Sequence, residues 1–170
     1  MTTIPAFGEL IAATTTSAIH LEMRDAYTPQ DPVFLDWMRG EPIDAVERHR
    51  EWYDVVRATV ARGVTMRRAR IVSEPLADFT RFEYECTAAL NIAAGEQVRW
   101  LPRRLASDLC LPGNDFWVFD SRLARFNHFA GDGSSGEKEM REEPGVVQLC
   151  NGAFEAVWER AIDHSDYKPL

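Results

Sequence analysis

The sequence predicts a mixed α/β (α+β) fold, in which a small central sheet with one crossover helix and a hairpin is packed by N-terminal helices and a long C-terminal helix. Apolar residues follow helical spacing through most of the first 62 residues, strand-like segments follow, and a long apolar stripe occupies residues 146–161. No linker or repeat divides the 170 residues. We therefore predict a single domain, 1–170, whose helical part, 1–62, packs on a sheet-containing part, 63–170.

Three short helices are expected first. The apolar spacing indicates one helix over Phe7–Ala13 and a second over Ser17–Asp25. A third is expected over Val33–Arg39, because Pro32 suits the first turn of a helix and Gly40 suits its end.

A longer helix is expected over Asp44–Arg62. Asp44 is a good N-cap, and Gly63 provides the residue that commonly follows a helix. Its apolar stripe consists of Val46, His49, Tyr53, Val56 and Val60.

The sheet is expected to begin with Val64–Val72, which alternates apolar and basic residues and therefore suits a position near an edge. Pro75 then permits a crossover helix over Leu76–Ala89, and Gln97–Leu101 forms the next strand before Pro102.

A hairpin is expected from Asp115–Phe119 and Leu123–Phe129, joined through the turn formers Asp120-Ser121-Arg122. The glycine-rich stretch Gly131–Glu137 reads as a flexible loop, and Pro144 begins the long final helix.

The composition indicates a cytoplasmic protein with reduced thiols. No segment resembles a signal peptide or a membrane span. Cys86, Cys110 and Cys150 are odd in number and widely spaced, so neither a disulfide framework nor a zinc site is expected.

A net charge of −8 disfavours direct binding to nucleic acid. The central stretch 57–104 nevertheless carries nine Arg against five acids, between acidic flanks. This basic stretch is either a solvated surface or an internal salt-bridge network, or it forms a groove for an anion or a partner.

Two local patterns lack the residues that would complete a catalytic or cofactor site. Gly131-x-Gly133-x-x-Gly136 has dinucleotide-binding spacing, but it follows a late strand and leads into a charged segment. His20-x-Glu22 has the spacing of a zinc deaminase, but the required Pro-Cys-x-x-Cys is missing. We therefore expect no catalytic residue, metal ion or cofactor.

A ligand groove is instead predicted where the strands end, because open α/β sheets form clefts there. Three arginines would recognise an anionic group, two tryptophans would supply apolar contact, and two aspartates would orient the arginines. The predicted ligand-binding residues are Arg70, Arg81, Arg99, Trp100, Asp115, Trp117, Asp120 and Arg122. The alternative is that these charges form only an internal salt-bridge network.

Several blocks together resemble an actinobacterial family of uncharacterised proteins encoded beside helix-turn-helix regulators. They are His20-Leu21-Glu22-Met23-Arg24-Asp25-Ala26-Tyr27, Arg70-Ile71-Val72-Ser73-Glu74-Pro75 with Arg81-Phe82-Glu83, Ala94-Gly95-Glu96-Gln97-Val98-Arg99 and Asp115-Phe116-Trp117-Val118-Phe119-Asp120. The resemblance implies regulation rather than metabolism, with a partner protein such as a helix-turn-helix regulator, and it is compatible with a homodimer.

The order of strands also resembles one half of a phospholipase D-type domain, whose chemistry uses a His-x-Lys-x-x-x-x-Asp pattern. If Asp120 takes the aspartate position, Gly113 and Asp115 stand at the histidine and lysine positions, so the resemblance implies a degenerate site. We therefore predict a non-enzymatic regulatory or accessory binding protein. The alternatives are a phosphodiester- or nucleotide-directed hydrolase and an accessory DNA-binding protein.

Overall fold

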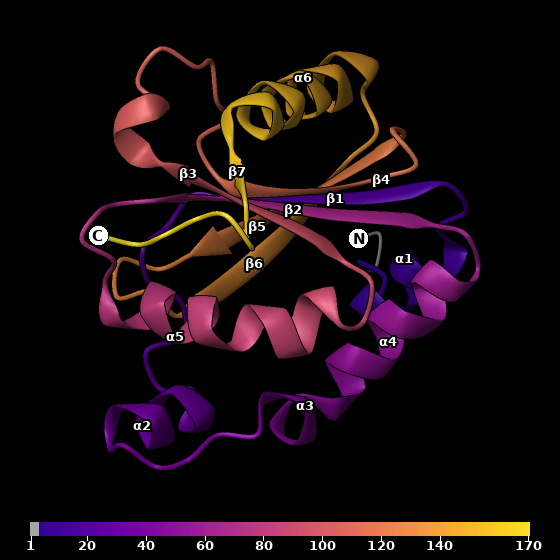
Figure 1. Cartoon of the computed structure of the whole chain (residues 1–170). Coiled ribbons are helices and arrows are strands. Elements are labelled where there is room, and N and C mark those ends of the chain that lie inside the picture. Colours follow the sequence, from indigo (N-terminus) through magenta and orange to yellow (C-terminus); the bar gives the residue numbers. More distant parts are fainter. Residues whose placement is uncertain (1–3) are drawn as a thin grey trace.

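The computed structural model describes residues 4–170, which form a seven-stranded mixed sheet with helices on both faces (Figure 1). The strands are β1 (Ser17–Glu22), β2 (Thr65–Val72), β3 (Gln97–Pro102), β4 (Asp115–Phe119), β5 (Leu123–Phe129), β6 (Ser135–Arg141) and β7 (Ile162–Asp163). The helices are α1 (Phe7–Ala13), α2 (Pro32–Met38), α3 (Ala45–Arg48), α4 (Arg50–Ala61), α5 (Asp78–Thr87) and α6 (Pro144–Arg160), with a π-helical extension of α5 over Ala88–Ile92 and a 3₁₀ turn over Arg103–Leu105.

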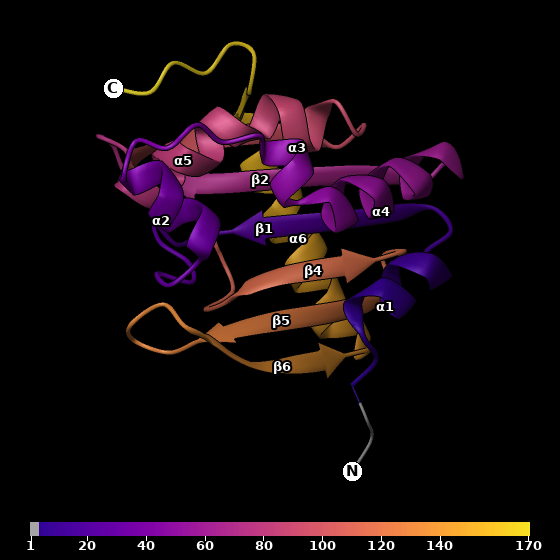
Figure 2. The same cartoon turned by 90° about the horizontal axis from the view of Figure 1, so that it is seen from below.

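The strand order is β6-β5-β4-β1-β2-β3-β7. Strands β1, β2 and β3 are parallel, and the other pairs are antiparallel. Helix α6 covers one face, and α1, α4 and α5 lie on the other (Figure 1). Seen from below, α4 and α5 lie along β1 and β2, whereas much of β5 and β6 is uncovered (Figure 2). The mixed α/β class, the hairpin, the crossover helix and the long C-terminal helix are thus confirmed.

The core lies mainly between the sheet and α6. Residues at alternate positions, such as Ile19, Leu21 and Ile71, pack against Phe154 and Val157 of this helix. Because side chains alternate across a strand, the intervening residues of β1 and β2 point to the opposite face, where the polar groups gather.

The helix predicted over Ser17–Asp25 was wrong, because this segment contains the central strand β1. Ile19 and Met23 have helical spacing, but Ile19 and Leu21 also have strand spacing. Both faces of the strand are covered, so Ala18 and His20, which point to the opposite face from Ile19 and Leu21, are buried as well. The described N-terminal part is therefore not entirely helical.

Three other parts of the chain differ from the predictions. The helix predicted over Asp44–Arg62 is interrupted at His49, where φ is −122° and ψ is 35°, and it forms α3 and α4. Part of the loop predicted over Gly131–Glu137 belongs to β6, which pairs with β5. The two-residue strand β7 was not predicted.

Strand β2 is not near the edge of the sheet, because it lies between β1 and β3. Its Arg68 and Arg70 are buried, with 7% and 5% of their surfaces exposed. Arginine tolerates such burial when carboxylates pair with it, and Glu22 of the neighbouring strand pairs with both.

Candidate functional site

Four side chains form a row across the face of the sheet that α6 does not cover. Arg125 of β5 lies opposite Trp117 of β4, Trp117 lies opposite His20 of β1, and His20 lies opposite Arg68 of β2. Directly paired residues project to the same face of a sheet. The strand register therefore brings a cation, an aromatic ring, an imidazole and a second cation together.

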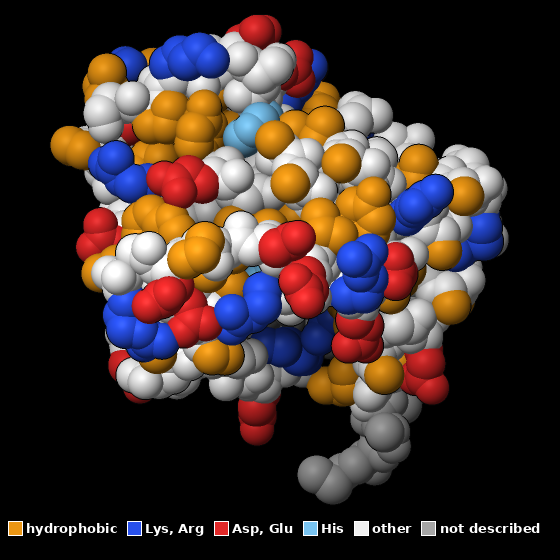
Figure 3. All heavy atoms as spheres, turned by 60° about the horizontal axis from the view of Figure 1, so that its bottom comes forward, with side chains coloured by type: hydrophobic (Ala, Val, Ile, Leu, Met, Phe, Trp, Pro, Cys, Tyr) orange, Lys and Arg blue, Asp and Glu red, His pale blue; other side chains and the backbone are white. Residues whose placement is uncertain are grey.

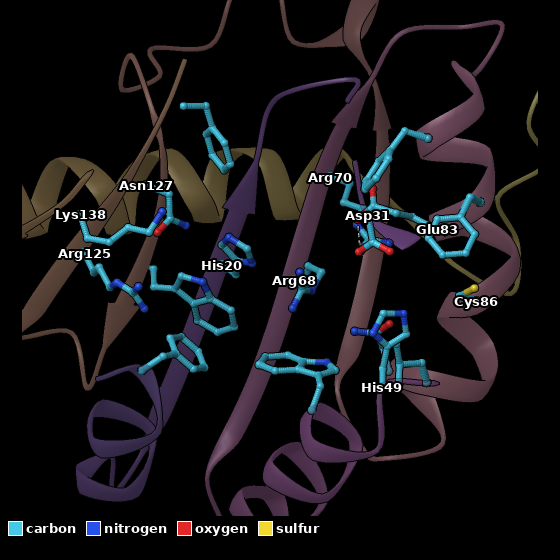
Figure 4. Close-up of a pocket in the computed structure, with 18 residues that line it drawn as sticks. His20, Asp31, His49, Arg68, Arg70, Glu83, Cys86, Arg125, Asn127 and Lys138 are labelled. Atoms are coloured by element: carbon cyan, nitrogen blue, oxygen red, sulfur yellow. Dashed lines mark hydrogen bonds and ion pairs between the residues drawn. The ribbon is translucent and has the colours of Figure 1, made fainter. Parts of the chain in front are cut away.

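A cavity of about 440 Å³ lies over this row. Figure 4 shows Arg125, Asn127 and Lys138 on one side, His20 and Arg68 in the middle, and Asp31, Arg70 and Glu83 on the opposite side. Six aromatic residues also line it: Phe7, Trp52, Phe79, Phe82, Trp117 and Phe129. Its volume and its aromatic lining are typical of a site for a small molecule.

His20 contributes a polar ring without a hydrogen-bond partner to this cavity. Only 7% of its surface is exposed, and neither ring nitrogen is hydrogen-bonded among the described residues. Nδ1 lies 3.5 Å from Glu22 Oε1, without forming a hydrogen bond. Burial lowers the pKa of His20 well below its usual value; the charge of Glu22 opposes this effect, whereas the charges of Arg68 and Arg70 reinforce it. The imidazole is therefore neutral at pH 7.

Glu22 holds the two buried arginines beneath the cavity. It accepts hydrogen bonds from Arg68 Nη1 at 2.6 Å and from Arg70 Nε at 2.5 Å. Burial alone would raise the pKa of Glu22, but the charges of Arg68 and Arg70 hold it well below the usual value. Arg68 Nε also donates to Glu96 at 3.0 Å. The positive charges of these arginines are thus largely neutralised within the protein.

Glu83 of α5 provides a carboxyl group at one end of the cavity. Its Oε1 accepts a hydrogen bond from Arg70 Nη2 at 3.1 Å, whereas Oε2 has no partner among the described residues. Burial raises the pKa of Glu83 to about 7, although the charge of Arg70 opposes this effect. Near neutral pH this carboxyl therefore exists in both protonation states and retains a free oxygen.

Arg125 and Lys138 lie at the other end and lack an acidic partner among residues 4–170. Burial lowers the pKa of Arg125, and burial together with the charge of Arg125 lowers the pKa of Lys138. The Arg125 guanidinium lies over Phe7, 5.2 Å from the ring centroid, and its Nε is unpartnered. Lys138 Nζ donates to Ser135 Oγ at 2.7 Å. These two residues are the cations of the cavity whose charge is not neutralised.

The structure brings two of the eight predicted ligand-binding residues, Arg70 and Trp117, into this cavity. Asp115 is buried. Its carboxylate accepts hydrogen bonds from the Tyr27 hydroxyl at 2.5 Å and from the backbone N–H of Met23 at 2.9 Å. Burial raises the pKa of Asp115 to about 6. Arg81 is exposed on α5 and is not among the lining residues.

The other four predicted residues lie elsewhere. Trp100 is fully buried and stacks on Tyr167 at 5.6 Å, and Arg99 pairs with Asp163 on the α6 side of the sheet. Arg122 is exposed in the turn after β4. Asp120 accepts hydrogen bonds from the backbone N–H groups of residues 15–17. Neither Asp115 nor Asp120 pairs with an arginine among the described residues, so the role of holding arginines in place was wrong.

The sequence reasoning missed His20, Arg68, Arg125 and Lys138 as cavity residues. A signal was present, because in two strands a polar residue stands between apolar neighbours: His20 between Ile19 and Leu21, and Arg125 between Ala124 and Phe126. Such alternation puts the polar residues of buried strands on one face. Which strands are neighbours, however, depends on the topology.

The fold resembles solved structures of very different sequence. One is Nuc, a phospholipase D family member from Salmonella typhimurium, with a TM-score of 0.53, 12% identity, and coverage of 92% of this chain and 86% of that chain. Another is TrmBL2, an archaeal chromatin protein described with a novel mode of DNA binding, with a TM-score of 0.50, 13% identity, and coverage of 91% of this chain but 48% of that chain. The expected likeness in fold to a phospholipase D-type domain is confirmed, and it concerns the fold alone.

Residues 5–169 match the family described as "Domain of unknown function (DUF6879)". No curated protein matches the chain. Within residues 4–170, no helix is long and apolar enough to cross a membrane, and no group of three His, Cys, Asp or Glu side chains is arranged to hold a metal ion.

Proposed function

Because the chain belongs to the DUF6879 family, whose function is unknown, we propose from the cavity itself that the protein is a ligand-binding module without catalytic activity. The ligand is a small molecule with an anionic group and an apolar, flat part. The cationic end of the cavity binds the anion, and the aromatic side chains contact the flat part.

The observation that carries this proposal is the cation pair Arg125 and Lys138. Two neighbouring cations raise each other's free energy, and partial burial adds a desolvation cost to both. No carboxylate among the described residues compensates for this. A phosphate or carboxylate group placed between them would relieve the repulsion and accept charge-assisted hydrogen bonds. By contrast, Arg68 and Arg70 already have carboxylate partners.

The surface of the helical side does not favour a nucleic-acid ligand. Figure 3 shows Lys and Arg side chains interspersed with Asp and Glu on this face. With a net charge of −8, such a surface lacks the positive stripe that phosphate contacts along a nucleic acid require. A small anion needs positive charge only at one point, and Arg125 and Lys138 provide it within the cavity.

One observation favours a second candidate function, the hydrolysis of a phosphodiester. His20 is a neutral, unpartnered imidazole in the cavity, as a histidine nucleophile would be. Counted from His20, however, the lysine and aspartate positions of the His-x-Lys-x-x-x-x-Asp pattern are Glu22 and Tyr27. Glu22 is committed to two arginines and cannot bind a phosphate, so binding without turnover is the better-supported function.

In this proposal, ligand binding serves regulation in the cytoplasm. The resemblance to proteins encoded beside helix-turn-helix regulators supports a protein partner that responds to the occupied cavity. The largely uncovered face of β5 and β6, which carries the two free cations, would be the part of the molecule most changed by a bound anion.

Thermal unfolding in the presence of phenyl phosphate tests the proposal. We expect a concentration-dependent rise in Tm for the wild type and no rise for Arg125→Ala/Lys138→Ala. The matched control is Arg81→Ala/Arg122→Ala, which removes two exposed arginines and the same charge. Equal Tm shifts in all three proteins would reject the cavity as the anion site, and would favour general electrostatic attraction.

Turnover separates the two candidate functions. Incubation with bis(p-nitrophenyl) phosphate should release no nitrophenol from a pure binding module. Release that disappears in His20→Asn but persists in Arg81→Ala/Arg122→Ala would establish the hydrolase instead.

A further inference from the structure

The two ends of the cavity differ in what they offer a ligand. Arg125 and Lys138 offer donors and positive charge, whereas Glu83 and Asp31 at the opposite side offer carboxyl oxygens (Figure 4). Glu83 Oε2 has no partner among the described residues. Asp31 uses Oδ1 to cap α2 through the N–H groups of Val33 and Phe34. One end therefore binds an anion and the other end accepts hydrogen bonds.

The middle of the cavity is built for a flat ring. His20 stacks on Trp117 with ring centroids 4.1 Å apart, and Trp52 lies 6.1 Å from Trp117. The Arg68 guanidinium lies 5.4 Å from the ring centroid of Trp52 and 5.5 Å from that of Trp117. Aromatic side chains and a planar cation provide faces for stacking. The unpartnered nitrogens of His20 add a hydrogen-bonding group among these faces.

The distance between the ends follows from the strand order. Arg125 stands on β5, and Glu83 of α5 contacts Arg70 of β2, so three inter-strand steps separate the strands that carry Arg125 and Arg70. At about 4.8 Å per step, the backbones of β5 and β2 lie about 14 Å apart. Bound phosphate alone would therefore occupy one end and leave the carboxyl end empty.

Resting on the proposed function, we infer that the ligand is a dipolar aromatic molecule, with its anionic group at Arg125 and Lys138 and its N–H donors at Glu83 and Asp31. A purine nucleoside monophosphate has this build. Its phosphate, flat base and base N–H groups correspond to the cationic end, the aromatic middle and the carboxyl end. Guanine presents two adjacent N–H donors, which a carboxylate accepts together.

Isothermal titration calorimetry with GMP, ribose 5-phosphate and guanosine tests the inference. We expect GMP to bind the wild type at least tenfold more tightly than either fragment. Glu83→Gln should weaken GMP about fivefold to tenfold and leave ribose 5-phosphate unchanged. Asp31→Asn, which keeps a good N-cap, should also weaken GMP selectively. The matched control, Glu51→Gln, changes an exposed glutamate of α4 and should affect neither ligand.

The outcomes separate this inference from the proposed function. The inference is overturned if ribose 5-phosphate binds as tightly as GMP, or if Glu83→Gln weakens the binding of both ligands equally. Either result would mean that the carboxyl end does not recognise the base. The anion site then still stands. If neither GMP nor phenyl phosphate binds, or if Arg125→Ala/Lys138→Ala binds both unchanged, the proposed function itself is rejected.

Discussion

His20 lies nearly parallel to Trp117, with ring centroids 4.1 Å apart and an interplanar angle of 16°. The two residues are direct partners in the antiparallel pairing of β1 with β4. The stack buries one face of the imidazole and leaves both nitrogens without hydrogen bonds among the described residues. It places a neutral polar ring in the middle of the cavity.

The neutral state of His20 predicts a specific pH dependence of folding. Burial lowers the folded-state pKa, so the unfolded chain takes up a proton first as the pH falls below about 6.5. Stability is therefore lost on acidification. From pH 7 to pH 5, the wild type should lose about 1–2 kcal/mol more than His20→Phe, which has no proton to take up.

Urea unfolding of both proteins at several pH values measures this difference. Glu83 and Asp115 have raised pKa values and change stability in the opposite direction, but they are present in both proteins and cancel. Parallel stability curves for the wild type and His20→Phe would show that His20 titrates normally in the folded protein.

The sequence pattern was sufficient to predict elements that are buried on one side only, or whose ends are marked by proline or glycine. Pro144 and the stripe of α6, and Pro32 with Gly40 around α2, located helices correctly. Strand β1 was misread because a short segment buried on both faces lacks a clean period. Its burial is a consequence of the topology, which brings β2 and β4 to its two sides.

Glu22 should contribute far more to stability than Glu155, which also pairs with an arginine of β2. Removing its charge by Glu22→Gln leaves Arg68 and Arg70 buried with too few acidic partners, and we expect a loss of about 3–5 kcal/mol. Glu155 pairs with Arg67 at 2.6 Å but is half exposed, so Glu155→Gln should cost at most about 1 kcal/mol. Urea unfolding at pH 7 measures both. Similar losses would mean that water or alternative partners compensate the buried arginines.

Asp120 should stabilise the fold by holding the start of β1. Its carboxylate accepts the N–H groups of Thr15, Thr16 and Ser17, at 2.7–3.1 Å. These bonds overcome the effect of burial and hold the pKa of Asp120 well below its usual value. Asp120→Asn tolerates the same positive φ of 50° and should cost about 1–2 kcal/mol at pH 7.

The sign of the pH effect provides a second check on Asp120. A lowered carboxyl pKa gives stability that is present above the unfolded value of about 3.9 and is lost as the pH falls below it. The difference between the wild type and Asp120→Asn should therefore shrink towards pH 3. Asp54→Ala, an exposed change on α4, is the control and should remain within about 0.5 kcal/mol of the wild type. If the difference in stability between the wild type and Asp120→Asn is constant from pH 7 to pH 3, the loss comes from altered hydrogen-bond geometry rather than from the lost charge.

The site could be predicted only in part, because its residues come together through strand pairing. Arg70 and Trp117 were chosen for their position in a basic stretch and an aromatic strand, and both line the cavity. Arg125 and Lys138 stand in segments that showed no basic cluster in the sequence. They become neighbours because β5 and β6 form a hairpin, whereas the sequence predicts no strand at β6 and a loop over its first three residues.

Lys138 should destabilise the protein when no anion is bound, because the empty anion site holds two neighbouring cations. Its charge faces Arg125 without a carboxylate partner among the described residues, so Lys138→Gln should raise the free energy of unfolding by about 0.5 kcal/mol in low salt. The gain should disappear in 0.5 M sodium chloride, which screens the repulsion. Lys168→Gln, near the C-terminus, is the control and should bring no gain. A loss of stability in Lys138→Gln at low salt would show that the contacts of Lys138 with Ser135 and Phe129 outweigh the repulsion, and would remove the energetic basis of the anion site.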